Sequence, residues 1–370
     1  MEFFPAAKPH LAGVRNYQPG RPIEEVEREY GVKNACKMAS NENALGPSPK
    51  ALAAIQRNLS KIHRYPDGGC FYLRKRLSKF LGVKPEELIF GNGSDEVLVL
   101  AVRAFAGPGD EVVIASPTFL IYEIASQAEH AAVVKVPMKN FRYDLVGMKA
   151  RISGKTKLIF IANPDNPIGT YVNGKELHSF LSGVPENVPV VLDEAYYEFA
   201  RQNKDYPDSV KMFGDFKNLI ITRTFSKAYG LSGLRIGYGI ASDRIVNALN
   251  KVREPFNVNL LAQAAALAAL DDPAHVKKTL RMVCDGKKYL NTGLQKLKLK
   301  VIETATNFTL FDLGRDAQPV YEALLRKGVI VRPMAAWGLP SFIRVTVGKK
   351  EENIKFMMAL RLILKKGKQK

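Results

Sequence analysis

The chain has 370 residues, of which 46% are hydrophobic and 25% charged, a composition typical of a soluble globular protein. The lack of any run of about 18 or more apolar residues excludes a membrane-spanning helix, and three scattered cysteines exclude a disulfide framework. The formal net charge of +19 leaves two explanations: a nucleic acid or other polyanion as partner, or a basic surface around an enzyme for small anionic substrates.

The basic residues are spread along the chain without a nucleic-acid-binding motif, so we expect no nucleic-acid partner. Their only dense cluster, Lys365, Lys366, Lys368 and Lys370, is expected to be a solvated end of the chain. The N-terminus lacks a basic start followed by an apolar run, and the few cysteines suit a reducing compartment. We therefore expect a cytoplasmic protein with no cleaved signal and no membrane association.

The first forty residues contain Pro5, Pro9, Pro19 and Pro22 and are predicted to be irregular. Short apolar runs then alternate with helical patterns. Strands are predicted at 88–90, 111–115, 131–136, 157–162, 188–192 and 218–222, and helices at 95–105 and 175–181. Strands rich in Val and Ile that alternate with helices predict an α/β fold with a mostly parallel sheet. Functional residues of such a fold gather at the carboxyl ends of the strands.

The pattern changes after position 255. Helices are predicted at 260–270, 274–297, 320–327 and 351–364, and strands at 301–304, 309–312, 329–332 and 342–347. This is an α+β unit. We therefore predict a large domain at 45–255, a smaller C-terminal domain at 256–370, and an N-terminal segment at 1–44 that packs on the small domain or the cleft.

Three other motifs carry no function. The Gly154-Lys155-Thr156 triplet lacks the first glycine of a phosphate-binding P-loop, and Gly237-Tyr238-Gly239 lacks the third glycine of a dinucleotide fingerprint. The five histidines show no spacing typical of metal ligands, so no metal site is expected.

The segment 224–235 holds the clearest chemical signal. Thr224 and Ser226 precede Lys227 there, and Arg235 follows it by eight positions. Hydroxyls and a guanidinium are groups that bind a phosphate dianion. A lysine amine beside a phosphate site suggests a Schiff base to pyridoxal 5'-phosphate (PLP), whose ring stabilises carbanions.

Such a cofactor requires further groups, and the sequence offers each of them at a predicted strand end. Asp193 follows a buried strand and could face the pyridine nitrogen, while Tyr196 and Asn166 could bond the ring oxygen. Phe119 could cover the ring face, and the helix start at 93–95 could bind the phosphate. Each residue alone has a structural explanation, as a turn, cap or core residue. Together, in this order, they are hard to explain by packing.

These motifs are similar to those of fold-type I PLP enzymes, and the chain most closely resembles the histidinol-phosphate aminotransferase family. The likeness covers nearly the full length. It rests on the segments 16–20, 39–49, 64–67, 91–96, 163–169, 193–196, 226–235 and 344–348. The resemblance implies a fold-type I PLP-dependent transferase, with a large domain built on a mostly parallel mixed sheet and a smaller α+β domain.

The resemblance also implies roles in cofactor binding. Lys227 is expected to hold PLP covalently and to move the substrate proton, and Asp193 to pair with the ring nitrogen. Asn166 and Tyr196 are expected to bind the ring oxygen. The phosphate is expected to be held by Ser94, Asp95 (through its backbone N–H), Thr224, Ser226 and Arg235.

Substrate binding and assembly are implied in the same way. Arg344 is expected to bind the glutamate carboxylate, and Arg344 with Arg332 and Tyr17 the phosphate of histidinol phosphate. Asn41 lies in a segment that closes over the substrate. Tyr65 is expected to reach the cofactor phosphate of a neighbouring subunit, which implies a homodimer with shared sites.

The expected reaction is the ping-pong exchange between histidinol phosphate and 2-oxoglutarate in histidine biosynthesis, which yields imidazole acetol phosphate and glutamate. Trp337 departs from the commoner family pattern, as do Ile168 and Asp165. Trp337 packs on the domain seam, or it favours phenylalanine or tyrosine, so an aromatic aminotransferase is the alternative. Threonine-phosphate decarboxylation, a regulator with a transaminase-like body, and a second role in polyanion binding are further alternatives.

Overall fold

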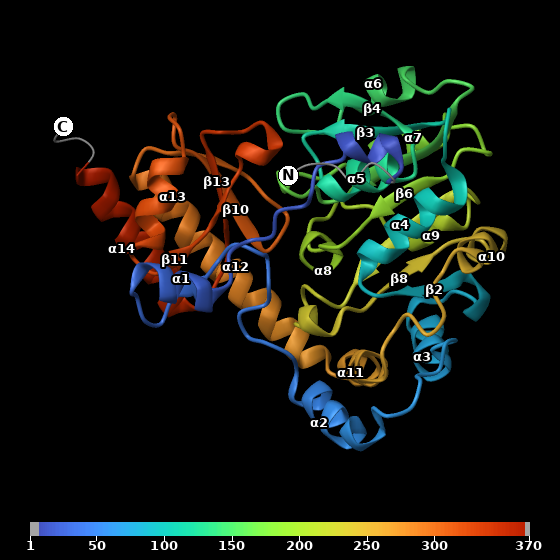
Figure 1. Cartoon of the computed structure of the whole chain (residues 1–370), viewed down its shortest axis with the longest axis horizontal. Helices are drawn as coiled ribbons and strands as arrows, with labels where there is room; N and C mark the ends of the chain where they lie inside the picture. Colours follow the sequence, from blue (N-terminus) through green and yellow to red (C-terminus); the bar gives the residue numbers. More distant parts are fainter. Residues whose placement is uncertain (1–6, 367–370) are drawn as a thin grey trace.

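The computed structural model describes residues 7–366 and shows two domains side by side (Figure 1). The larger one is built on a seven-stranded sheet with the order β2-β8-β7-β6-β5-β3-β4. Its strands are β2 (Leu88–Gly91), β3 (Glu111–Ser116), β4 (Ala132–Pro137), β5 (Thr156–Ala162), β6 (Val190–Asp193), β7 (Leu219–Thr224) and β8 (Gly237–Ile240). Only β8 runs antiparallel to its neighbours β2 and β7. The predicted mostly parallel sheet is therefore confirmed.

The central strands β5, β6 and β7 are buried along almost their whole length, which explains their apolar runs at 158–162, 190–192 and 219–221. The covering helices are α4 (Ser94–Phe105), α5 (Leu120–Ala128), α6 (Leu145–Ala150), α7 (Gly174–Leu181), α8 (Tyr197–Ala200), α9 (Ser209–Phe213) and α10 (Asp243–Lys251). Helix α4 contacts α5 and α10, while α6 contacts α7 (Figure 1).

A three-helix group lies beside the sheet and includes a helix from the C-terminal part of the chain. It consists of α2 (Pro49–Asn58), α3 (Phe71–Leu81) and α11 (Leu260–Leu270). Ala262 and Ala265 of α11 belong to the same buried core as Leu73 of α3 and the sheet strands. We expected everything after position 255 to belong to the small domain, but α11 packs with the large one. The other domain boundaries remain predictions.

The smaller domain contains an antiparallel four-stranded sheet in the order β12-β13-β10-β9. Its strands are β9 (Lys300–Ile302), β10 (Phe308–Asp312), β12 (Arg332–Pro333) and β13 (Phe342–Thr346), and its helices are α12 (Pro273–Lys296), α13 (Gln318–Leu325) and α14 (Lys350–Lys366). The single strand predicted at 329–332 is two short strands. Of these, β11 (Val329–Ile330) pairs with the N-terminal segment and β12 pairs with β13.

The N-terminal segment contacts both domains. Its start, η1 (Pro9–Gly13), lies on α5, where the His10 ring is 3.1 Å from the Ala128 carbonyl. Farther along, α1 (Ile23–Tyr30) packs Val26 against small-domain side chains, and β1 (Cys36–Lys37) pairs in parallel with β11. The prediction that the first forty residues are irregular is therefore wrong for α1 and β1.

Two terminal regions fall outside this description. Of the lysine tail, Lys365 is exposed, and Lys368 and Lys370 lie outside the described residues, as do residues 1–6 at the N-terminus. Between residues 7 and 366, every helix is either too short or too polar to cross a bilayer.

Candidate active site

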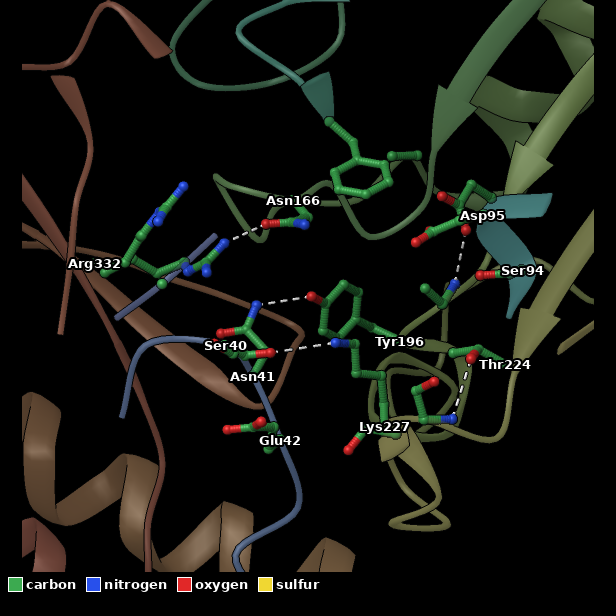
Figure 2. A pocket seen from close by; sticks show the side chains of 18 of the residues that line it. Ser40, Asn41, Glu42, Ser94, Asp95, Asn166, Tyr196, Thr224, Lys227 and Arg332 are labelled. Atoms are coloured by element: carbon green, nitrogen blue, oxygen red, sulfur yellow. Dashed lines mark hydrogen bonds between the residues drawn. The ribbon is translucent and has the colours of Figure 1, made fainter. Parts of the chain in front are cut away.

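A cavity of about 370 Å³ lies between the two domains and the N-terminal segment (Figure 2). Residues directly after β5, β6 and β7 line one side of it. Residues 332, 337 and 344 of the small domain line the other, together with residues 17 and 39–42. All the predicted site residues except Tyr65 line this cavity. They are Tyr17, Asn41, Ser94, Asp95, Phe119, Asn166, Asp193, Tyr196, Thr224, Ser226, Lys227, Arg235, Arg332 and Arg344.

Lys227 follows β7 and points into the middle of the cavity (Figure 2). Its Nζ donates to the Ser40 carbonyl at 3.4 Å and lies 5.7 Å from the centre of the Tyr196 ring. Burial lowers the pKa of Lys227 to about 8. A lysine amine with a pKa near neutrality has a substantial unprotonated fraction, and this is the form that attacks a carbonyl carbon. Sequence reasoning missed the Ser40 contact, because a backbone carbonyl leaves no residue-type signal.

Asp193 ends β6 and is only 6% exposed. Its carboxylate accepts hydrogen bonds from the Tyr122 hydroxyl at 2.7 Å, the Thr222 hydroxyl at 3.2 Å and the Ala195 N–H at 3.1 Å. Burial raises the pKa of Asp193 to about 6, and the hydrogen bonds partly oppose this rise. The carboxylate is thus held in place by neutral donors, and a cationic partner in the cavity would stabilise its charge.

Tyr122 is a site residue whose role the sequence did not reveal. Its ring is fully buried, stacks on Phe160 at 4.6 Å and meets the Phe119 ring edge-on at 5.6 Å. It thereby supports both Phe119 and Asp193. No local signal reveals this role, because Phe119 precedes α5 with an extended backbone and Asp193 lies 71 positions away.

The start of α4 forms a glycine-lined cradle with Arg235. A Cβ added at Gly93, where φ is +84°, would collide with the Arg235 guanidinium. A Cβ added at Gly237 of β8 would collide with the backbone N–H of Ser94. The two glycines therefore let a guanidinium and a helix N-terminus approach each other closely, as an anion-binding site requires.

Hydroxyl groups complete this cradle. Arg235 Nη1 donates to the Ser226 hydroxyl at 3.4 Å, and Arg235 Nη2 lies 3.4 Å from the Asp95 carboxylate. The Thr224 hydroxyl accepts from the Ser226 N–H at 3.0 Å. Figure 2 shows Ser94, Asp95 and Thr224 together on the side of the cavity away from Arg332.

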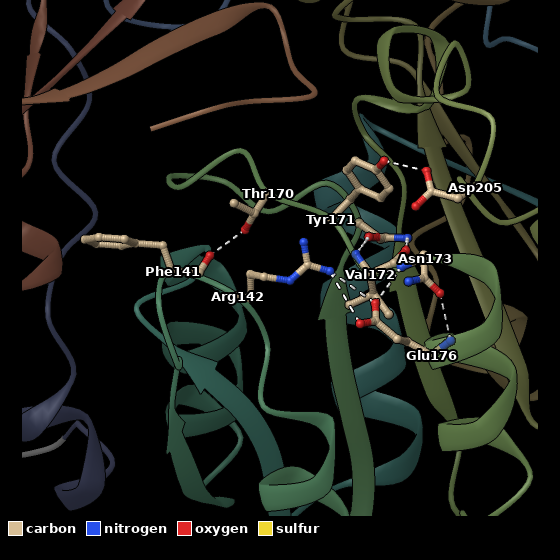
Figure 3. A network of polar contacts seen from close by, with 9 residues as sticks. Phe141, Arg142, Thr170, Tyr171, Val172, Asn173, Glu176 and Asp205 are labelled. Carbon is tan, nitrogen blue, oxygen red and sulfur yellow. Dashed lines mark hydrogen bonds and ion pairs between the residues drawn. The ribbon is translucent and has the colours of Figure 1, made fainter. Parts of the chain in front are cut away.

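The loop after β5 places Asn166 over the middle of the cavity (Figure 2). Its Oδ1 accepts a hydrogen bond from Arg344 Nη1. The loop is fastened from its outer side, where the Thr170 hydroxyl donates to the Phe141 carbonyl at 2.5 Å and the Tyr171 hydroxyl to Asp205 at 2.6 Å (Figure 3). These outer contacts hold Asn166 in one position relative to the sheet.

Asn41 brings the N-terminal segment onto the opposite side of the cavity. It is 1% exposed, and its side-chain amide donates to the Tyr196 hydroxyl at 2.8 Å. Its own N–H donates to the Thr346 hydroxyl at 2.9 Å. Burial raises the pKa of Tyr196, so this hydroxyl stays protonated.

Two arginines stand at the small-domain end of the cavity. Arg344 is 5% exposed and donates through Nη2 to the Ala39 carbonyl at 2.8 Å. Its Nε is one of three buried side-chain polar atoms that lack a hydrogen-bond partner within residues 7–366. Arg332 donates to the Gln18 carbonyl at 2.6 Å, next to the half-exposed Tyr17. This end of the cavity therefore suits an anionic substrate.

Tyr65 is the predicted site residue that the structure leaves outside the cavity. It is 84% exposed and stacks on Phe256 at 4.9 Å. Within one chain it contacts none of the other predicted site residues.

The cavity residues fit a phosphorylated pyridine aldehyde. The buried Asp193 carboxylate faces the cavity and has no cationic partner among residues 7–366, and an amine with a lowered pKa stands at Lys227. The cradle at Gly93 and Arg235 provides the anion site. Carboxylate, amine and anion site are the three groups that PLP requires.

Comparisons with known proteins agree with this chemistry. The family described as "Aminotransferase class I and II" matches residues 33–360. A histidinol-phosphate aminotransferase from Moorella thermoacetica is 49% identical over 361 residues, which are 97% of this chain and 93% of that protein. One from an Anaeromyxobacter species is 47% identical over 97% of this chain and 99% of that protein. The crystal structure of histidinol-phosphate aminotransferase from Sinorhizobium meliloti in complex with PLP superposes with a TM-score of 0.89 at 29% identity, covering 98% of this chain and 99% of that one.

The chain therefore belongs to the class I and II aminotransferase family and is a fold-type I, PLP-dependent enzyme. Within that class, the relatives at 44–49% identity are histidinol-phosphate aminotransferases. The family, fold type and cofactor predicted from the sequence are confirmed. The same relatives favour the predicted main function over the aromatic aminotransferase alternative.

Proposed function

We propose that the protein is a histidinol-phosphate:2-oxoglutarate aminotransferase of histidine biosynthesis, and that the predicted cavity residues perform the reaction. The observation that supports this most is that Lys227 and Asp193 line the same cavity as two arginines, Arg332 and Arg344. Lys227 and Asp193 suit PLP chemistry, and the arginines suit two anionic substrates used in turn.

The side chains that would surround the PLP ring are oriented to donate hydrogen bonds to it or to accept them from it. Bound PLP supplies an electron sink for the negative charge that develops at the substrate carbon. Asp193 holds a proton at the ring nitrogen. The Tyr196 hydroxyl accepts from Asn41, so its own proton is free for the ring oxygen. Asn166 Oδ1 is occupied by Arg344, which leaves the amide N–H₂ of Asn166 to donate.

Lys227 has two tasks at one atom. Its Nζ would hold the cofactor covalently and would supply the free amine that accepts and returns the proton at the substrate carbon. The lowered pKa of about 8 keeps this atom close to the pH at which it both accepts and returns a proton. The cradle of Ser94, Ser226 and Arg235 would hold the cofactor phosphate and would thereby orient the ring beside Lys227.

Arg344 and Arg332 sort the substrates by their anionic groups. The partnerless Nε of Arg344 leaves a buried donor for a carboxylate or phosphate. Arg332 and Tyr17 lie nearer the mouth, where we place the phosphate of histidinol phosphate. Asn41 holds the N-terminal segment across the same end and excludes water from the reacting atoms.

We also infer a homodimer in which Tyr65 reaches the cofactor phosphate of the partner. Its support is a set of exposed large apolar side chains in and next to α2, η2 (Leu59–Lys61) and α3, the elements on either side of Tyr65 in the sequence. Their exposures are 41–75%: Leu52, Leu59, Ile62, Phe71, Tyr72 and Phe80. A surface of this kind is typical of a protein–protein interface. We place the enzyme in the cytoplasm, where Cys36 and Cys70 would remain buried thiols.

Steady-state assays test the substrate. The purified holoenzyme is given histidinol phosphate, phenylalanine or tyrosine, each with 2-oxoglutarate. We expect the highest kcat/KM with histidinol phosphate. Equal or higher efficiency with phenylalanine would contradict the proposed substrate while leaving the fold and cofactor unchanged.

A further inference from the structure

Trp337 lies on the seam between the domains and also lines the active-site cavity. It ends the short turn η5 (Ala335–Trp337) and is 8% exposed. It belongs to a small apolar cluster with Phe342 of the small domain and Ile168 of the large domain. Two residues that depart from the family pattern, Ile168 and Trp337, are thus members of the same cluster.

The indole nitrogen fixes this turn to the large domain. Trp337 Nε1–H donates to the Thr118 carbonyl at 3.0 Å, and this bond is buried. The Thr118 hydroxyl in turn donates to the buried Asp165 carboxylate at 2.6 Å. Asp165 accepts from the Ile168 N–H at 2.9 Å. The indole is therefore tied to the turn before Phe119 and, through Asp165, to the loop that carries Asn166.

The face of the same indole supports Arg332. The Arg332 guanidinium carbon lies 5.2 Å from the ring centre, within the range of a cation–π contact. Among the contacts of residues 7–366, Arg332 has one hydrogen bond, to the Gln18 carbonyl, and no carboxylate partner. The ring is therefore the rigid surface against which this guanidinium is oriented.

Arg344 is held by a different set of groups. It donates to Asn166 and to the Ala39 carbonyl, and its guanidinium carbon lies 5.1 Å from the Phe308 ring. Its hydrogen bonds therefore do not include Trp337. The loop that carries Asn166 is also fastened by Thr170 and Tyr171, so we expect a change at Trp337 to move Arg332 more than Arg344.

We propose that Trp337 is a positioning residue for Arg332. Held by its hydrogen bond to Thr118, the indole determines the preference for a phosphorylated amino donor over glutamate. This inference rests on the proposed function, in which Arg332 binds the phosphate of histidinol phosphate. It differs from the alternative in which the bulk of Trp337 favours aromatic substrates, because here the ring serves a neighbouring arginine.

Two substitutions separate the two contacts of the indole. Trp337→Phe keeps an aromatic face and removes the N–H, and we expect KM for histidinol phosphate to rise about two- to tenfold. Trp337→Leu also removes the face, and we expect a rise of about tenfold or more. In both variants we expect kcat, and KM for glutamate in the reverse direction, to stay within about twofold of wild type.

A matched control changes the same apolar cluster away from Arg332. Phe342→Leu truncates a buried ring that meets Phe141 edge-on at 5.5 Å and does not line the cavity. We expect any loss in this variant to be equal for both substrates. A double-mutant cycle completes the test: in an Arg332→Gln background, Trp337→Leu is expected to raise KM for histidinol phosphate by less than about twofold, because the two residues act as one unit.

The outcomes distinguish this inference from the proposed function. Equal losses for histidinol phosphate and glutamate, or independent effects in the cycle, would overturn the positioning role alone. A selective loss of phenylalanine turnover in Trp337→Leu would instead support the aromatic-pocket alternative and would also overturn the positioning role. A wild-type enzyme that does not use histidinol phosphate would overturn the proposed function, and this inference with it.

Discussion

Lys227 and Asp193 share a physical situation, because burial favours the neutral form of each. The pKa of Lys227 falls to about 8, and that of Asp193 rises to about 6. Both groups are therefore poised to exchange protons near neutral pH. A cofactor with a cationic ring nitrogen and an aldehyde would suit both groups, since the nitrogen would pair with the carboxylate and the aldehyde would react with the free amine.

The reactivity of Lys227 is expected to follow its lowered pKa. In the cofactor-free protein, the rate of covalent attachment of PLP is expected to rise with pH with a midpoint near 8, because only the unprotonated amine attacks the aldehyde. Stopped-flow absorbance at several pH values measures this rate, with Lys227→Ala as the control for other lysines. A midpoint near the usual lysine pKa of about 10.4 would contradict the effect of burial.

The same shift affects the stability of the cofactor-free protein. The folded pKa of Lys227 lies below the unfolded value, so the unfolded chain binds more protons in the interval between them. The contribution of this group to the free energy of unfolding therefore rises as pH increases from about 8 towards the unfolded value. Asp193 behaves differently: its folded pKa is raised, so its contribution is largest below the unfolded pKa and is lost as pH rises through about 6.

Asp193→Asn tests the charge of the carboxylate at nearly constant size. We expect kcat to fall by about a hundredfold or more in both half-reactions, because a neutral amide does not hold the proton on the ring nitrogen. Thr222→Val is a matched control that removes one hydroxyl donor to Asp193 and keeps the charge. We expect a loss of about tenfold or less there, with the acidic limb of the pH–rate profile moved to higher pH. Similar activity in Asp193→Asn and wild type would contradict the assigned role.

At the scale of elements, the carboxyl ends of β5, β6 and β7 and the start of α4 line the part of the cavity in which we propose that the cofactor binds. Gly93, with its positive φ, allows the Arg235 guanidinium to approach the helix start. This close approach places a cation beside the N-terminus of a helix, an arrangement that favours anion binding.

Gly93→Ala is expected to open this cradle. The added Cβ collides with Arg235 and is strained at this φ, so we expect the Kd of the apoprotein for PLP to rise about tenfold or more. Gly107→Ala, beyond the other end of α4, meets no atom within 4 Å and serves as the control, with a Kd close to wild type. Fluorescence titration with PLP measures both. An unchanged Kd for Gly93→Ala would show that the cradle does not bind the phosphate.

The elements that the sequence predicted are those with a local signal. The strands β5 to β7 contain apolar runs at 158–162, 190–192 and 219–221. Asp193 ends β6, and Lys227 lies three positions after the end of β7. Strand β8 lacked that signal, because Gly237 and Gly239 lower strand propensity. The fold requires these glycines: a side chain at Gly237 would displace the start of α4. Tertiary contact outweighs propensity there.

Helix α1 was missed for a similar reason. Pro22 marks a break in the chain, yet it occupies the N-cap position before Ile23, where proline is compatible with a helix start. Val26 is its only buried residue, so the apolar pattern is short. Contacts such as Tyr122 to Asp193 and Trp337 to Thr118 join segments 71 and 219 positions apart, and no local pattern specifies them.

At the scale of the whole molecule, two features join the two domains around the cavity: the N-terminal segment, and the apolar cluster of Ile168, Trp337 and Phe342. The segment touches α5 near His10, lines the cavity at Tyr17 and Asn41, and enters the small-domain core at Val26. Movement between the domains therefore moves the substrate end of the cavity relative to the cofactor end. Tyr65 lies outside this arrangement, and its proposed role requires a second chain.

A subunit-complementation experiment tests whether Tyr65 serves a neighbouring site. Tyr65→Ala and Lys227→Ala are each expected to impair every site of their own homodimer, Tyr65→Ala by about tenfold or more. If each site combines Lys227 of one chain with Tyr65 of the other, a hybrid of the two variants contains one intact site. Random exchange makes about half of the dimers hybrids, so about a quarter of all sites are intact and activity rises well above that of either variant.

The control for this experiment pairs Lys227→Ala with Asp193→Asn. Lys227 and Asp193 line one cavity of one chain, so no hybrid of these variants contains an intact site, and we expect no recovery. Native mass spectrometry verifies that hybrids form in both mixtures. Recovery confined to the Tyr65 mixture would show that the active site is completed across the interface. Hybrids without recovery would confine the site to a single chain and leave Tyr65 and its stacking partner Phe256 as interface residues.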